Sequence, residues 1–178
     1  MDHIITYTGE SFRPLNPDIN KIKIEDIAHA LSLTCRANGH VRHFYSVAQH
    51  CINCANEAKA RGLSARIQLA CLLHDGSEAY ISDITRPVKR QLSQYLEIED
   101  RLQTLVYKKF LGSSLSDEEG ALVSEVDDDI LAHEFDALMT KRVYDTLPGI
   151  SSKPTFDIQD AAAVENVFLQ LAQSLEQR

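Results

Sequence analysis

Two polar side chains follow directly on an apolar run. Residues 67–73 lead into His74 and Asp75, and Glu78 comes four residues after His74. That spacing is expected to return Glu78 to the helix face that carries His74. Because charged groups are rarely buried without partners, an imidazole beside a carboxylate here needs a cation, a substrate or a hydrogen-bond network. Taken alone, the pair fits a hydrogen-bonded core histidine better than a functional site.

Two further polar residues interrupt apolar stripes of helical spacing. His50 falls on a stripe that continues through Cys54, in a segment that opens with a good capping serine. Asp127 lies four residues before Leu131, at a position where a leucine would pack against the core. Both side chains are therefore expected to point into the interior.

The inward polar groups make chemical sense as one metal site. Two imidazoles and two carboxylates suit a first-row divalent cation and leave coordination positions for water and substrate. Separate core hydrogen bonds would have to explain each group independently. We therefore predict one ion of Mn, Co, Mg, Fe or Zn, with its identity open, held by His50, His74, Asp75 and Asp127.

Apolar spacing predicts that helices position these residues. The fold class expected is all-α, a single domain over 1–178 with about six to seven helices. A short extended segment covers 1–23, the metal-binding helical core covers 24–140, and 156–178 hold a C-terminal covering helix. Helices are expected over 24–35, 46–61, 64–74, 87–91, 93–111, 116–139 and 158–175.

Composition limits the classes of partner. The chain has 178 residues, 44% of them hydrophobic, which suits one globular domain. A net charge of −8 argues against a nucleic-acid polymer. Residues 36–90 nevertheless carry eight Lys and Arg against four Asp and Glu, so this segment can attract a small anion. No apolar run reaches the roughly 18 residues that span a bilayer, and we expect a cytoplasmic protein without a membrane partner.

The four cysteines fall inside segments with helical spacing. Cys51 and Cys54 have the spacing of a redox or zinc motif, but a second pair of this kind is missing from the sequence. They are interpreted, with Cys35 and Cys71, as small core residues in a reducing compartment.

The combined motifs resemble a known superfamily. YSVAQH at 45–50, HDGSEAY at 74–80 and DITRPVK at 83–89, followed by Asp127, are similar to the HD superfamily of metal-dependent phosphohydrolases. Within it, the likeness is to the branch of deoxynucleoside 5′-monophosphatases, and it covers roughly residues 24–140. The resemblance implies an all-α fold and the same four metal ligands.

The resemblance also implies roles for residues around the metal. It implies an acid or base near the attacking water at Glu78, a sugar contact at Asp83 and a phosphate contact at Arg36. Asp75 would act in catalysis as well as in metal binding. Ala37 stands where that branch has an aromatic residue, so weak discrimination among bases is expected. Further substrate contacts, expected from charge and position, are Arg42, His43 and Lys89.

The expected reaction is hydrolysis of a phosphomonoester of a small nucleotide, best a deoxynucleoside 5′-monophosphate, by a metal-activated water. One alternative is a triphosphohydrolase that uses Arg86, Lys89 and Arg90 as a longer phosphate cradle. Another is a metal-stabilised binding or regulatory module without catalysis. A homodimer or a higher homo-oligomer stays open.

Overall fold

Short polar side chains set the beginnings of the long helices. Ser46 and Ser116 each form a capping box with the residue three positions later, and they open α2 (Val47–Ala60) and α7 (Asp117–Leu138). Ser64 caps α3 (Ala65–Leu73), as expected, and Asp160 caps α8 (Ala161–Glu176). Helix α8 therefore begins three residues later than predicted from the apolar spacing.

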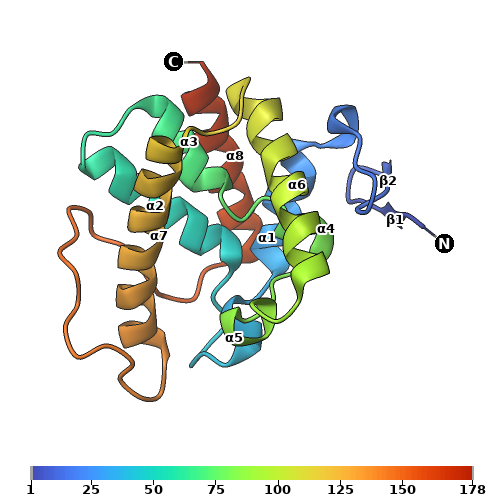
Figure 1. Cartoon of the computed structure of the whole chain (residues 1–178). Coiled ribbons are helices and arrows are strands. Elements are labelled where there is room, and N and C mark those ends of the chain that lie inside the picture. The colour runs from blue at the N-terminus through green and yellow to red at the C-terminus, as the bar shows by residue number, and fades with distance from the viewer. Residues whose placement is uncertain (1, 178) are drawn as a thin grey trace.

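The computed structural model describes residues 2–177 and confirms an all-α bundle (Figure 1). Helix α3 packs against α2, α6 (Ser93–Leu111), α7 and α8, and α1 (Ile24–Leu33) packs against α2 and α8. Two four-residue helices, α4 (Glu78–Ile81) and α5 (Arg86–Lys89), link α3 to α6. Helices α7 and α6 flank α3 in Figure 1, so the segment that ends in His74 lies inside the bundle.

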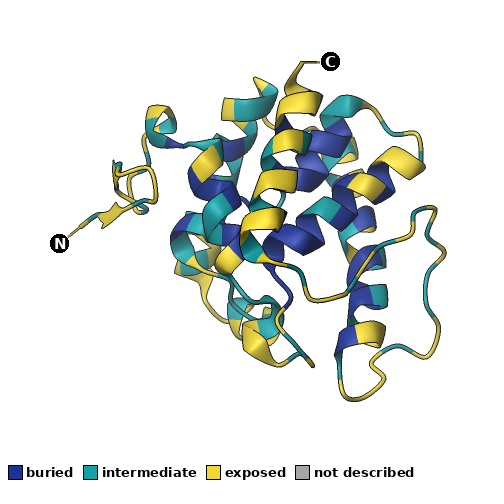
Figure 2. Cartoon of the chain, turned by 180° about the vertical axis from the view of Figure 1, so that it is seen from behind, coloured by how far each residue is buried: buried dark blue, intermediate teal, exposed yellow. Residues whose placement is uncertain are grey.

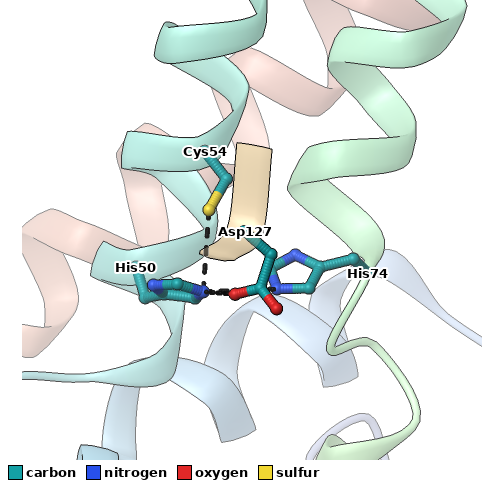
Figure 3. A group of neighbouring side chains, drawn as sticks. All are labelled: His50, Cys54, His74 and Asp127. Atoms are coloured by element: carbon teal, nitrogen blue, oxygen red, sulfur yellow. Dashed lines mark hydrogen bonds and ion pairs between the residues drawn. The ribbon is translucent and has the colours of Figure 1, made fainter. Parts of the chain in front are cut away.

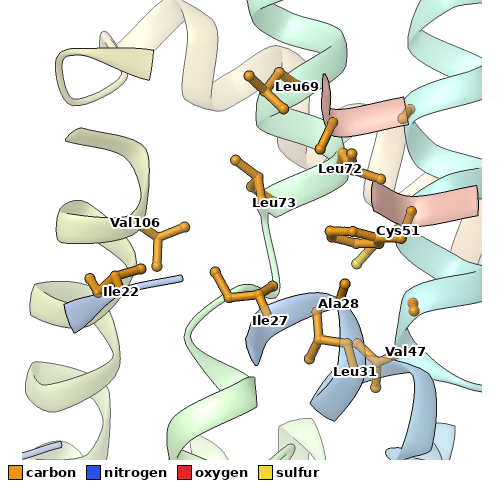
Figure 4. Close-up of a cluster of buried hydrophobic side chains, with 14 of the residues drawn as sticks. Ile22, Ile27, Ala28, Leu31, Val47, Cys51, Leu69, Leu72, Leu73 and Val106 are labelled. Atoms are coloured by element: carbon orange, nitrogen blue, oxygen red, sulfur yellow. The ribbon is translucent and has the colours of Figure 1, made fainter. Parts of the chain in front are cut away.

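The core divides into two apolar clusters. The larger one joins α1, α2, α3, α6 and α8, and Figure 4 shows part of it around Leu72 and Cys51. The smaller one joins α2, α3 and α7 through residues such as Cys71, Val126 and Ile130. Helices α2 and α3 contribute to both clusters. The backbone that carries their polar residues is therefore held by apolar packing on two sides.

Helix α3 fits its predicted bounds of 64–74 but does not continue to Glu78. It ends at Leu73, and His74 is its C-terminal capping residue. The backbone N–H of Gly76 then donates to the Leu73 carbonyl at 2.8 Å, and a Cβ at Gly76 would lie 2.9 Å from that oxygen. The turn thus requires glycine. Glu78 starts the separate helix α4, so the expectation that it shares a helix face with His74 is wrong.

Helix α1 also ends earlier than predicted. It stops at Leu33, and Cys35 then forms an isolated β-bridge with Ser46. The short 3₁₀ helix η2 (Arg36–Gly39) follows, with Ala37 and Asn38 at positive φ. The pairing of this segment with the entry to α2 replaces the last helical turn.

The N-terminal segment forms a small hairpin beside the bundle. Strands β1 (Ile4–Ile5) and β2 (Ser11–Phe12) pair antiparallel, and η1 (Ile19–Lys21) leads into α1. Phe12 is fully buried and stacks on Tyr80, with ring centroids 4.2 Å apart. This contact attaches the hairpin to α4.

Within residues 2–177, every helix is too short or too polar to cross a membrane.

The segment between α7 and α8 is held by side chains rather than by regular structure. Gln49, Asn53 and Glu57 recur every four residues along α2 and bind backbone groups of residues 150–157, which we call the strap. Both oxygens of the buried Glu57 accept backbone N–H groups, from Ser151 at 2.8 Å and Ser152 at 2.7 Å. Figure 2 shows the strap crossing the surface with mostly exposed and intermediate residues.

Candidate metal centre

The imidazole rings of His50 and His74 face each other through their Nε2 atoms. These atoms lie 3.3 Å apart, and the ring centroids lie 5.1 Å apart. His50 is fully buried on α2, and His74 follows the last residue of α3. The two histidines predicted to point inward are therefore brought together.

The other nitrogen of each ring is held by an acceptor. His74 Nδ1 donates to the carbonyl oxygen of Cys71 at 2.8 Å, and His50 Nδ1 donates to Glu134 Oε2 at 2.9 Å. Carbonyl and ionised carboxylate oxygens only accept, so each Nδ1 carries a hydrogen. In neutral rings, both Nε2 atoms would then present lone pairs that repel each other at 3.3 Å. A cation between them removes this repulsion, and metal-bound histidines are oriented in this way by their second nitrogen.

Two further donor atoms reach the same point. Asp127 Oδ1 lies 3.0 Å from His50 Nε2 and 3.7 Å from His74 Nε2. Cys54 Sγ lies 3.6 Å from His50 Nε2. The four potential ligand atoms are all within 4.8 Å of one another. Figure 3 shows these side chains converging from α2, α7 and the end of α3. This buried group could hold a metal ion.

Asp75 lies beside this group. Its Oδ1 is 3.4 Å from His74 Nε2, and its Oδ2 is 3.4 Å from Arg36 Nη1. With Cys51 and His74 it forms a second group of potential ligands. All four ligand residues predicted from the sequence thus have an atom within 3.7 Å of a histidine Nε2.

The charges around the histidines favour a cation. Burial and Arg36 oppose a charge on His50, but Cys54, Glu134 and Asp127 raise its pKa well above the usual value. The pKa of His74 is likewise raised, since Asp75 and other neighbours outweigh its burial. Burial works to raise the pKa of Asp127, yet the two histidines hold it well below its usual value. The carboxylate is therefore ionised and ready to bind a proton donor or a metal ion.

Glu134 is a site residue that the sequence analysis missed. It is fully buried, and its second oxygen accepts from Arg36 Nε at 3.0 Å, so one carboxylate orients both His50 and Arg36. Glu134 lies seven residues after Asp127 on α7, two turns along the same face. A carboxylate at an apolar position was the signal that identified Asp127, and the same signal is present at Glu134.

A cavity of about 450 Å³ opens beside the centre. One part of its lining is apolar and comes mainly from the end of α7 and the segment after it, through Leu131, Phe135, Met139 and Tyr144. The other part carries the charged groups. The charged lining residues are Arg36, Asp75, Glu78, Asp83, Arg86, Lys89 and Asp127. The cavity therefore places a group of cations, a group of carboxylates and an apolar wall around one space.

Glu78 lies in this cavity without being part of the four-residue donor group. Burial, Asp75 and Asp83 raise its pKa well above the usual value, although Lys89 and Arg36 act in the opposite direction. Its Oε1 is 3.4 Å from Lys89 Nζ, and its Oε2 is buried without a hydrogen-bond donor among residues 2–177. A carboxyl with a raised pKa in a cavity can hold and transfer a proton.

The remaining residues predicted to bind substrate fall into two groups. Arg36, Asp83 and Lys89 line the cavity, as does Ala37. Arg42 and His43 do not line it. Arg42 Nε donates to the Met139 carbonyl at 3.1 Å, and His43 Nε2 donates to the Phe156 carbonyl at 2.8 Å. Both side chains are thus occupied in holding the segment that follows α7.

A more open hollow of about 290 Å³ adjoins the first cavity. Arg86, Lys89 and Asp127 line both spaces, and Arg90 lines the second one alone. Arg86 pairs with Asp127 Oδ2 at 3.1 Å and with Asp128 Oδ1 at 2.9 Å. The three basic residues of 86–90 thus line this hollow, and two of them also line the cavity beside the candidate metal site.

Comparison with known proteins gives relatives of uncharacterized function. The chain is 36% identical over 110 residues to the uncharacterized protein YfdR of Escherichia coli K12, a match of 62% of this chain and 59% of that protein. It is 38% identical over 109 residues to the uncharacterized protein RCAP_rcc00048 of Rhodobacter capsulatus, with 58% and 55% covered. The chain therefore spans less than two thirds of the length of these curated relatives. No protein-family model matches it.

Proposed function

We propose that this protein is an HD-type metal-dependent phosphohydrolase that hydrolyses a phosphomonoester of a small nucleotide. The observation that carries the proposal is the pair of Nε2 atoms of His50 and His74, 3.3 Å apart beside Asp127, with both Nδ1 atoms already bonded. This arrangement fits a divalent ion better than a set of core hydrogen bonds, because it concentrates lone pairs at one point. His50, His74, Asp75 and Asp127 supply nitrogen and oxygen donors for the ion.

The cavity residues have matching roles in phosphate chemistry. A divalent ion bound there would neutralise phosphate charge and lower the pKa of a water molecule that it holds. Lys89, together with Arg36, would offset the remaining negative charge of the ester. Glu78 would hold or move the proton of the attacking water, since its buried carboxyl has a raised pKa. Asp83 lies near enough to line the same space and would accept a hydrogen bond from the sugar.

The apolar wall supports a nucleotide over a smaller phosphate ester. Phe135, Met139 and Tyr144 line the cavity on the side of α7 and its C-terminal extension. An aromatic base can stack on such a surface, and stacking is tolerant of base identity because every base has a π-face. This wall also supplies a surface for the base, which the small side chain of Ala37 does not.

The test is a phosphate-release assay with a panel of deoxynucleoside monophosphates and glycerol phosphate, with Mn²⁺, Co²⁺, Mg²⁺ or Zn²⁺ added. We expect metal-dependent release from the monophosphates, and a larger loss in Phe135→Ala for the nucleotides than for glycerol phosphate. Metal binding without turnover on any substrate would favour the non-catalytic module.

The hollow beside Arg86 favours a second candidate substrate. A deoxynucleoside triphosphate could place its outer phosphates against Arg86, Lys89 and Arg90, which line this one hollow. Such an enzyme would release tripolyphosphate rather than orthophosphate. Arg90→Ala would then impair triphosphate turnover and leave monophosphate turnover unchanged, which separates the two substrates.

A further inference from the structure

The donor group contains a sulfur atom in addition to the nitrogen and oxygen ligands expected from the sequence. Cys54 lies one helical turn after His50 on α2, and its Sγ is 3.6 Å from His50 Nε2. The side chain is 1% exposed. On one side it packs into the apolar cluster between α2, α3 and α7, which agrees with the prediction that it is a small core residue. Its sulfur, however, lies against the polar centre.

The distances from His50 Nε2 to the other donor atoms fit a small four-coordinate ion. In a tetrahedral zinc site, metal–nitrogen bonds near 2.05 Å and metal–sulfur bonds near 2.3 Å place two nitrogens about 3.3 Å apart and a nitrogen and a sulfur about 3.6 Å apart. The two histidine Nε2 atoms are 3.3 Å apart, and Cys54 Sγ is 3.6 Å from the nearer one. The distances from Asp127 Oδ1 to the two nitrogens are 3.0 Å for His50 and 3.7 Å for His74. One is shorter and the other longer than the ideal separation.

Cys54 also approaches from a direction that leaves the cavity side free. Asp75 and Asp127 line the cavity, whereas Cys54 and His50 do not. A sulfur ligand behind the ion would therefore not displace water or substrate. Zinc accepts a fifth ligand in catalytic sites, so Asp75 or a water molecule on the cavity side can take the fifth position beside His50, His74, Asp127 and Cys54.

We propose that Cys54 is a thiolate ligand of the same ion, so that the centre selects a borderline-soft ion such as Zn²⁺ or Co²⁺ over Mn²⁺ or Mg²⁺. On binding, the S–H bond breaks, its electron pair is donated to the metal, and the proton leaves to solvent. Thiolate ligands favour zinc, whereas oxygen ligands favour magnesium and manganese. The inference rests on the metal-binding part of the proposed function and is independent of the substrate.

Cobalt provides a direct test, because thiolate coordination to Co²⁺ produces a charge-transfer absorption band in the near ultraviolet. The full chain is loaded with Co²⁺, and its spectrum and metal content are compared with those of Cys54→Ser and Cys54→Ala. We expect the parent protein to show the band and both variants to lose it. Competition between Zn²⁺ and Mn²⁺ should show a preference for Zn²⁺ that falls at least tenfold in the variants.

Cys71→Ser is the matched control, since Cys71 is a buried cysteine on α3 that belongs to neither group of potential ligands. It should keep the band and the preference for Zn²⁺. Circular dichroism checks that each variant is folded. A parent protein without the band, a band that survives in the Cys54 variants, or an unchanged metal preference would overturn the proposal. If only the phosphatase assay failed, the cobalt spectrum and the metal competition would be unaffected. That result would count only against the proposed reaction.

Discussion

Glu134 Oε2 accepts a hydrogen bond from His50 Nδ1 at 2.9 Å, and its other oxygen accepts one from Arg36 Nε at 3.0 Å. One buried carboxylate thus connects His50 of the candidate metal site with the arginine that lines the cavity. Burial acts to raise the pKa of Glu134, but Arg36 and His50 hold it below its usual value, so the group is ionised. The relationship makes Glu134 a positioning residue for both neighbours.

Replacing Glu134 by Gln keeps the shape of the side chain and removes its charge. Loss of such an outer partner of a ligating histidine typically costs 10- to 100-fold in metal affinity. We expect a loss of that size in Glu134→Gln, measured by metal competition with a chromophoric chelator. Glu125→Gln on the exposed part of the same helix is the control and should bind metal like the parent protein. Equal affinities in both variants would show that His50 needs no such support.

Replacing Asp127 by Ala should remove the metal and preserve the fold. The carboxylate is a donor at the centre, whereas the neighbouring hydrophobic residues of α7 supply the packing. Metal content after dialysis and far-ultraviolet circular dichroism measure the two effects separately. Asp128→Ala is a matched control, because Arg86 pairs with both aspartates but only Asp127 faces the histidines. Stoichiometric metal in Asp127→Ala would contradict the assignment of this ligand.

Replacing Glu78 by Gln should leave metal binding intact and lower kcat by about 10² to 10⁴, the range for a positioned acid or base. The reason is that Glu78 lies outside the four-residue donor group but inside the cavity. Glu99→Gln is the control, since Glu99 binds the same Lys89 ammonium and does not line the cavity. Unchanged turnover in Glu78→Gln would remove this residue from the proton-transfer step.

Replacing Arg36 by Lys preserves a positive charge but removes the planar fork that can bind two phosphate oxygens. We expect KM for the nucleotide to rise at least tenfold, about 1.4 kcal/mol. Arg36→Ala should in addition lower the melting temperature, because Glu134 would lose one of its two partners. Arg42→Lys should change neither quantity by as much, since its guanidinium binds the Met139 carbonyl outside the cavity.

The strap gives a pH dependence of stability that is independent of the metal. Burial alone would raise the pKa of Glu57, but hydrogen bonds from Ser152, Arg61 and Ser151 lower it from 4.5 to about 2. A pKa depressed in the folded state stabilises the protein above the unfolded value, and this contribution is lost as the pH falls from about 4.5 to about 2.

Urea unfolding at a series of pH values measures this contribution. Glu57→Gln should lower the free energy of unfolding by about 1.5–3 kcal/mol near neutral pH, the range for hydrogen bonds to a charged group. The difference from the parent protein should shrink as the pH approaches about 2. A difference that is constant with pH would mean that the charge of Glu57 does not carry the effect.

The sequence predicted the all-α fold from the helical spacing of apolar residues. It predicted the cluster of inward polar side chains at the positions where a polar residue interrupts that spacing. His50 and Asp127 were identifiable because each occupies an apolar position of a long helix. Cys54 was interpreted as a core residue because a thiol is itself apolar enough for such a position. The turn at Gly76 was missed because a close contact with Leu73 and Val106 has no local signature in the sequence.

The linker at 150–155 was predicted from its serines and proline, but its attachment to α2 was not, since bonds from side chains to a distant backbone leave no periodic pattern. Because the strap is attached to α2, the segment between α7 and α8 does not tolerate insertions equally along its length. Residues 150–157 are hydrogen-bonded to the helix that carries His50, so an inserted tag or domain there would disturb the position of His50. Exposed positions such as Asp145 and Thr146 lie just before it and make no bond to α2. An affinity tag or a fluorescent reporter is better placed at 145–146 than a few residues later.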